Sequence, residues 1–260
     1  MVALTDGERW ARAEFERLLE RRFSPGAVAG FLAASFRRSA HVRRSRPELA
    51  RQSRRWMAIG AAACLLPPFR ARARAGLAWW ALTSLMLDWH LGMIETTDGR
   101  RRPLSGADAL TLARAWLVPV AARAPTPAVM GAAALSDVVD GALGRRGEPT
   151  RAGRDLEGLV DACFGAAALR GALRRGAVAP AAVGVELARL GAGFGYALAI
   201  YFGRAEAPDP RVTRAARPAT PVRAAGLVAA GLGRRRRASA LLAAGSAWSI
   251  GSLVYGVRRG

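Results

Sequence analysis

Residues 136–145 read SDVVDGALGR and residues 153–161 read GRDLEGLVD, and these two stretches decide how the rest of the chain is interpreted. Each carries a pair of carboxylates, which are Asp137, Asp140, Glu157 and Asp161. Residues three or four apart share one face of a helix. Carboxylates at membrane depth are costly unless they face a polar cavity, a metal or one another, and hard divalent cations prefer clusters of oxygen ligands. The pattern therefore predicts two helices whose acidic faces meet around metal ions.

The composition favours a membrane protein. The chain has 260 residues, is 52% hydrophobic and carries a net charge of +21, and none of its 40 basic residues is lysine. So strong a positive charge makes nucleic acid a candidate partner. However, the arginines lie between long apolar runs, which is the arrangement that membrane topology uses. We therefore expect an integral membrane protein that does not bind nucleic acid, with a basic nucleic-acid-binding protein as one alternative.

The N-terminal part combines amphipathic, basic and apolar segments. Residues 8–22 are predicted to form an amphipathic helix, and residues 37–55 contain eight arginines. Those arginines suit either anionic lipid headgroups or the simple basic flank of a membrane segment. Two short apolar segments follow, at 56–69 and 76–94, and they predict either a tight transmembrane hairpin or a membrane-embedded cap.

Residues 95–107 form a polar linker, and the expected domain boundary lies within it. The N-terminal region is residues 1–104, and the second domain is residues 105–260. The second domain contains six apolar helical segments, at about 108–123, 126–145, 155–174, 177–203, 219–233 and 238–257. No segment has the alternation of a strand, so the predicted fold is all-α with a core of six transmembrane helices. Arginines are more numerous in the loops on the side of the membrane that holds residues 145–154 than in the loops on the opposite side. This bias predicts a multi-pass protein of the cell membrane whose acidic residues face the cytoplasm.

The two opening stretches resemble the signature of the CDP-alcohol phosphatidyltransferase family. That signature reads D-x-x-D-G-x-x-A-R and then, after eight residues, G-x-x-x-D-x-x-x-D. The positions that match are Asp137, Asp140, Gly141, Arg145, Gly153 and Asp161, with a spacer one residue shorter. Two positions differ, because Gly144 stands where alanine is usual and Glu157 where the third aspartate is usual.

Two further segments support the resemblance, which covers about residues 105–257. The family's first core helix often opens with N-x-x-T-x-x-R, and Asp108, Thr111 and Arg114 repeat that spacing with aspartate in place of asparagine. A weaker similarity is Arg217-Pro-Ala-Thr220, where many members have G-K-x-x-T.

The resemblance implies an enzyme of phospholipid biosynthesis that transfers a phosphatidyl group from CDP-diacylglycerol to an alcohol and releases CMP. It implies a homodimer, Asp161 as the general base, and Mg²⁺ or Mn²⁺ as cofactor. The implied metal ligands are Asp137, Asp140, Glu157 and Asp161. The implied CDP-binding residues are Asp108, Thr111, Gly141, Gly144, Arg145 and Gly153.

A phosphorylated acceptor would need cationic partners, because guanidinium groups bind phosphate through two parallel hydrogen bonds. The candidates are Arg114, Arg217 and Arg223. Family members use glycerol 3-phosphate, inositol phosphate or phosphatidylglycerol, and the resemblance leans slightly toward the glycerol-phosphate type.

The departures from the signature leave a second alternative open. The extra methylene of Glu157 displaces its carboxylate by roughly 1.5 Å, the length of one C–C bond. Since Mg²⁺ tolerates geometric error poorly, the alternative is a non-catalytic membrane relative that binds nucleotide or lipid. Four other residues receive structural interpretations. Glu186 and Arg189 are expected to form a local ion pair, and Asp88 is expected to form hydrogen bonds with its neighbours, as is His90.

Overall fold

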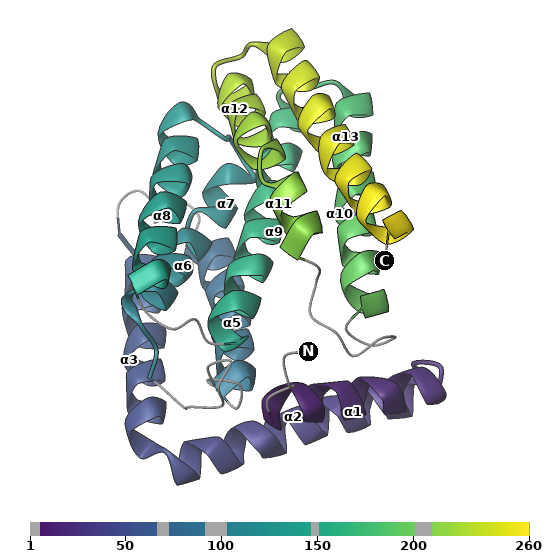
Figure 1. Cartoon of the computed structure of the whole chain (residues 1–260). Coiled ribbons are helices and arrows are strands. Elements are labelled where there is room, and N and C mark those ends of the chain that lie inside the picture. Colours follow the sequence, from purple (N-terminus) through teal and green to yellow (C-terminus); the bar gives the residue numbers. More distant parts are fainter. Residues whose placement is uncertain (1–5, 67–72, 92–102, 147–150, 201–209, 260) are drawn as a thin grey trace. The chain divides into compact units, whose positions relative to one another are not determined.

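The chain is described by a computed structural model that covers residues 6–66, 73–91, 103–146, 151–200 and 210–259. All the regular secondary structure of these residues is helical, and no strand occurs among them (Figure 1). The predicted all-α class is therefore confirmed.

The helices differ from the predicted segments mainly in where they break. Their bounds are α1 (Asp6–Glu20), α2 (Pro25–Ser45), α3 (Pro47–Ala63), α5 (Ala73–His90), α6 (Gly106–Ala115), α7 (Val118–Ala121), α8 (Pro127–Arg146), α9 (Arg151–Arg174), α10 (Pro180–Leu198), α11 (Pro210–Ala216), α12 (Ala219–Gly231) and α13 (Arg235–Arg259). The expected helix at 108–123 is two helices, because Pro119 has no N–H to bond to the carbonyl of Ala115, four residues earlier, and its ring crowds that carbonyl, so α6 ends at Ala115. The arginine-rich segment 37–55 is likewise divided at Pro47, between α2 and α3.

The described residues form two compact units. The first unit contains residues 2–119 and 136–161, and the second contains 120–135 and 162–260. Neither unit coincides with the division at 104 and 105 expected from the sequence, and that division stays a prediction.

The core of the first unit lies where α3, α5, α6 and the beginning of α9 meet. Leu87, Leu112 and Leu156 are each at most 3% exposed there. The α3 and α5 helices are neighbours because Gly60 leaves room for the Trp80 ring, whose Nε1 donates a hydrogen bond to the Met57 carbonyl at 2.7 Å. The two predicted apolar segments of the N-terminal region thus pack together, although residues 67–72 and 92–102 lie outside the described ranges.

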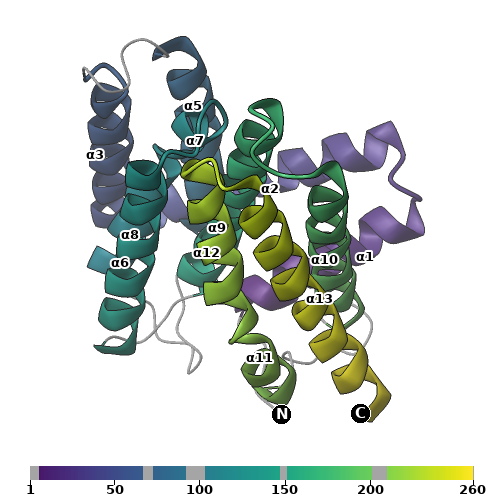
Figure 2. The ribbon, with the colours of Figure 1, turned by 90° about the horizontal axis from the view of Figure 1, so that it is seen from above.

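The core of the second unit is built from α10, α12 and α13 with the end of α9. Figures 1 and 2 show α12 and α13 side by side, with α10 alongside α13. Small residues allow this close approach, since a Cβ on Gly226 would lie 2.9 Å from Leu242 Cγ. Leu242 and Val178 are each 1% exposed in the resulting core.

Gly171 gives a direct test of how α9 packs against the end of α7. A Cβ at Gly171 would lie 2.2 Å from the Ala121 carbonyl oxygen, whereas a Cβ at Gly165, on the same helix, would meet nothing within 4 Å. We expect Gly171→Ala to lower the free energy of unfolding by about 1–3 kcal/mol through overpacking. The matched control Gly165→Ala should be neutral or stabilise α9 by up to about 1 kcal/mol. Thermal unfolding of the purified variants measures both, and equal effects at the two positions would contradict the described packing.

Among the described residues, one helix is long and apolar enough to cross a membrane, at Arg235–Tyr255 with a mean hydropathy of 1.3. Two of the other helices are too short to span. The α12 helix has 13 residues and α6 has 10, which at about 1.5 Å per residue cover roughly 20 and 15 Å of a hydrocarbon core about 30 Å thick. The core of six spanning helices expected from the sequence stays a prediction.

Candidate functional site

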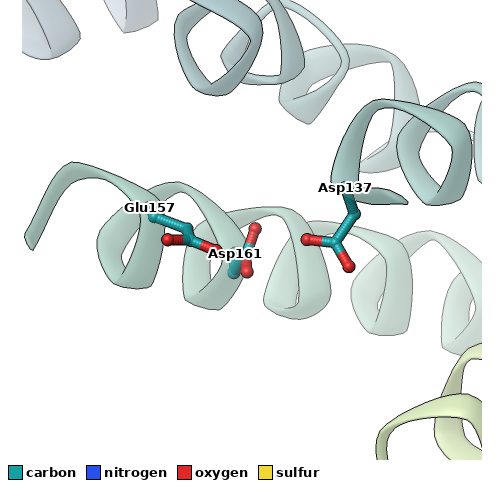
Figure 3. Close-up of side chains that lie close together, drawn as sticks. All are labelled: Asp137, Glu157 and Asp161. Carbon is teal, nitrogen blue, oxygen red and sulfur yellow. The ribbon is translucent and has the colours of Figure 1, made fainter. Parts of the chain in front are cut away.

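The acidic faces of α8 and α9 approach each other in the first unit. One carboxylate oxygen from each of Asp137, Glu157 and Asp161 lies within 4.8 Å of the other two. Figure 3 shows Glu157 and Asp161 on the same face of α9, with Asp137 reaching toward them from α8. The spacing of four residues places the α9 pair one turn apart. Three of the four carboxylates singled out in the sequence therefore form one group, called here the acidic triad.

Asp140, the fourth carboxylate, lies beside the acidic triad and is more deeply buried. It is 5% exposed, and its Oδ2 accepts hydrogen bonds from Thr111 Oγ1 at 2.8 Å and from Arg114 Nη2 at 3.0 Å. These two donors lie one turn apart on α6. One oxygen of Asp140 is thus held by α6 rather than directed at the triad.

Arg114 lies at the junction of the three aspartates and is 3% exposed. Its Nη1 contacts Asp137 Oδ1 at 3.3 Å and forms a hydrogen-bonded ion pair with Asp161 Oδ1. Its Nε donates to Ser136 Oγ at 3.1 Å. The sequence suggested Arg114 for an acceptor phosphate, and that role stays a prediction. Its partnership with the carboxylates was not foreseen, although its spacing of three from Thr111 places both residues on one face of α6.

Local hydrogen bonds fix the beginning of α6, and so the direction of Thr111 and Arg114. Asp108 Oδ2 accepts hydrogen bonds from the Ser105 backbone at 2.6 Å and from Ser105 Oγ at 2.8 Å, and Ser105 Oγ accepts from the Asp108 backbone at 3.4 Å. This reciprocal arrangement is a capping box. Asp108 is 6% exposed and is the third-residue partner of the Ser105 cap. Its role in CDP binding, suggested by the sequence, stays a prediction.

The other predicted CDP-binding residues follow the carboxylates along the helices. Gly141, Gly144 and Arg145 lie on α8 after Asp140, and Gly153 lies in the first turn of α9. The surroundings of the three α8 residues lie outside the described part of the structure. Their role in binding CDP stays a prediction.

The two remaining candidate arginines belong to the second unit. Arg217 is exposed between α11 and α12. Arg223, on α12, donates from Nη2 to Glu186 Oε1 at 2.6 Å. The expected Glu186–Arg189 ion pair is confirmed, with Arg189 Nη2 at 2.8 Å from the same oxygen. Ser246 of α13 also donates to Glu186, which is 3% exposed. One buried carboxylate thus joins α10, α12 and α13.

Asp88 and His90 make hydrogen bonds, as expected. Asp88 accepts from Ser39 and Arg43 and so ties α5 to α2. His90 Nδ1 lies 2.7 Å from the Met86 carbonyl oxygen of its own helix.

The acidic triad has the ligand type and spacing that a divalent cation requires. Carboxylate oxygens are the ligands that Mg²⁺ and Mn²⁺ prefer, and two oxygens on opposite sides of a Mg²⁺ ion lie about 4.2 Å apart, because each bond is about 2.1 Å long. Oxygens at adjacent positions lie about 3.0 Å apart for the same bond length. The three oxygens lie within 4.8 Å of one another, so small side-chain movements would bring them onto one ion. The residues therefore fit a metal ion.

Comparisons with known protein families, with curated proteins and with solved structures give no match for this chain.

Proposed function

We propose that this protein is a membrane enzyme of the CDP-alcohol phosphatidyltransferase type, which transfers a phosphatidyl group from CDP-diacylglycerol to an alcohol and releases CMP. One observation carries the proposal. The carboxylates of Asp137, Glu157 and Asp161 approach within 4.8 Å of one another, and they occupy the positions that the signature reserves for acidic residues. The approach of Asp137 to the pair on α9 joins two helices, which the spacing along one helix does not dictate, and it supports a shared metal site.

The chemistry follows from the residues around the triad. Mg²⁺ or Mn²⁺ held by these carboxylates would neutralise the pyrophosphate of the donor and stabilise the departing CMP. Asp161 has a side chain 46% exposed, so an acceptor hydroxyl can reach it. Asp161 takes the hydroxyl proton as that oxygen attacks the phosphorus that carries diacylglycerol. The bond from this phosphorus to the bridging oxygen breaks, and CMP leaves with that oxygen. Gly141 and Gly144, which lack side chains, would let the nucleotide approach α8 closely.

The proposal includes a location. We place the enzyme in the cell membrane as a multi-pass protein with six spanning helices in its C-terminal part, a cytoplasm-facing site and a homodimeric state. The arginine-rich N-terminal region would contact anionic lipids. Fractionation of cells separates this placement from the nucleic-acid alternative. Recovery in the membrane fraction, released by detergent and not by high salt, is the expected result. Recovery in the soluble fraction without detergent would contradict it.

The activity is tested with purified protein, CDP-diacylglycerol and a panel of acceptors that includes glycerol 3-phosphate, inositol phosphate and phosphatidylglycerol. The reaction is run with Mg²⁺, with Mn²⁺ and with a chelator, and both CMP and the mass of the lipid product are measured. We expect metal-dependent CMP release with one acceptor class, with glycerol 3-phosphate as the first candidate.

One observation favours a second function. Arg114 already pairs with Asp137, Asp140 and Asp161, so the carboxylates have a counter-ion without any metal. A non-catalytic relative that binds nucleotide or lipid would need no more than this. This second function would be favoured if the protein released no CMP with either metal in the acceptor panel but bound CDP-diacylglycerol measurably.

Glu157→Asp restores the residue usual in the signature and shortens the side chain by one methylene. Because Mg²⁺ requires accurate ligand placement, we expect this variant to release CMP at the wild-type rate or faster. Glu157→Gln, which keeps the length but removes the charge, should be about tenfold slower or worse. Initial rates across a Mg²⁺ titration measure both. A loss of activity in Glu157→Asp as large as that in Glu157→Gln would show that the native geometry is built around glutamate.

A further inference from the structure

Arg114 is held from its buried side and touches the acidic triad on its open side. Its Nη2 pairs at 3.0 Å with Asp140, whose side chain is 8% exposed, and its Nε donates to Ser136. Its Nη1 contacts Asp137 and Asp161, whose side chains are 49% and 46% exposed. The Arg114 guanidinium therefore contacts one buried carboxylate, that of Asp140, and two accessible ones, those of Asp137 and Asp161.

The two accessible carboxylates are also members of the acidic triad. A cation that binds the triad would share Asp137 and Asp161 with a guanidinium already in contact with them. Two positive charges within about 5 Å repel each other strongly where water is scarce. The arginine and the cation therefore cannot both keep their best contacts with these two carboxylates.

We propose that Arg114 is a positioning residue that serves as the internal counter-ion of the metal site: it holds the aspartates together in the metal-free protein, and a divalent cation displaces its Nη1 from Asp137 and Asp161. The inference rests on the proposed function only for the existence of that metal site. The contacts with Asp140 and Ser136 remain during displacement, so the guanidinium stays beside the bound cation. In the metal-free protein, the Arg114 guanidinium thus prevents repulsion between the carboxylates from separating α8 and α9.

The competition has a measurable signature in Mn²⁺ binding to the full-length protein in detergent micelles. Arg114→Gln and Arg114→Met remove the positive charge, and we expect both to bind Mn²⁺ about tenfold more tightly than the wild type, or better. Arg114→Lys keeps the charge and should bind Mn²⁺ within about threefold of the wild type. Arg43→Met, which removes a different carboxylate-bound guanidinium of the same unit, is the matched control and should leave Mn²⁺ affinity unchanged.

Thermal unfolding gives the second readout. The metal-free Arg114→Gln protein should unfold at a lower temperature than the wild type, and saturating Mn²⁺ should raise its midpoint by more than it raises that of the wild type. If Arg114 formed only a structural ion pair, Arg114→Gln would lower the unfolding midpoint, and Mn²⁺ would raise the midpoints of the variant and the wild type by the same amount. A wild-type measurement needs no variant: peptide-resolved phenylglyoxal modification at Arg114 should increase with Mn²⁺, because displacement frees Nη1.

The outcomes separate this inference from the proposed function. Mn²⁺ affinity that is unchanged or weaker in folded Arg114→Gln overturns the inference and leaves the metal site standing. If the variants do not fold, modification of wild-type Arg114 that does not rise with Mn²⁺ overturns it equally. Tighter Mn²⁺ binding in the variants without CMP release by the wild type supports the inference and removes the proposed activity. If neither the wild type nor Arg114→Gln binds Mn²⁺, both fall.

Discussion

Asp161→Asn should lower the rate of metal-dependent CMP release by about 10²–10⁴-fold, the usual contribution of a positioned general base. Asparagine has the same shape but cannot take a proton from the acceptor hydroxyl. It also removes the charge that pairs with Arg114 and one carboxylate of the acidic triad. Turnover is therefore lost through both proton transfer and metal binding, whereas the glycines of α8 are untouched. We expect binding of CDP-diacylglycerol to fall by much less than turnover, as measured by equilibrium binding beside initial rates.

Asp88→Asn is the matched control for this experiment. It makes the same chemical change at an aspartate of the same unit that is also bound by an arginine, Arg43. It should keep most of the wild-type rate, because Asp88 ties α5 to α2 and is not a member of the acidic triad. A normal turnover in Asp161→Asn, or equal losses in the two variants, would show that Asp161 has no special part in the reaction.

Glu186→Ala should destabilise the second unit by about 3–5 kcal/mol, the usual cost of removing one partner from a buried ion pair. The loss is large because Glu186 is 3% exposed and is the shared acceptor for Arg189, Arg223 and Ser246. Without it, two guanidinium groups remain close together in a mostly apolar helix bundle without their carboxylate. The midpoint of thermal unfolding should fall by many degrees.

Glu16→Ala provides the comparison, since its partner Arg12 lies four residues earlier, one turn away on an exposed helix face. Exposed pairs of this kind contribute about 0.3–0.5 kcal/mol. A small effect at Glu186, comparable to that at Glu16, would mean that α10, α12 and α13 are not joined by this carboxylate.

Short-range features could be predicted from the sequence because they depend on neighbours along the chain. Proline marks the beginnings of α8 at Pro127 and α10 at Pro180, where its fixed φ is compatible with the first helical turn. The pairing of Glu157 with Asp161 on one face follows from helix geometry alone. The Glu186–Arg189 ion pair has the same origin.

Long-range features could not be predicted in the same way. The pairing of Arg114 with Asp161 joins residues 47 apart, and the approach of Arg223 to Glu186 joins residues 37 apart. No local periodicity encodes which face of α6 meets α8 and α9, or which face of α12 meets α10. The core of six spanning helices expected from the apolar composition stays a prediction, since among the described residues one helix is long and apolar enough to cross a membrane.

The central claim is that the carboxylates of α8 and α9 hold a cation for phosphatidyl transfer. The most direct test is the amount of CMP that purified protein releases from CDP-diacylglycerol with Mg²⁺ or Mn²⁺, compared with a chelator, in wild type and in Asp161→Asn. The account predicts release that requires both the metal and Asp161. Folded wild-type protein that releases no CMP with either metal and any acceptor, or that releases it equally in the chelator, would contradict the claim.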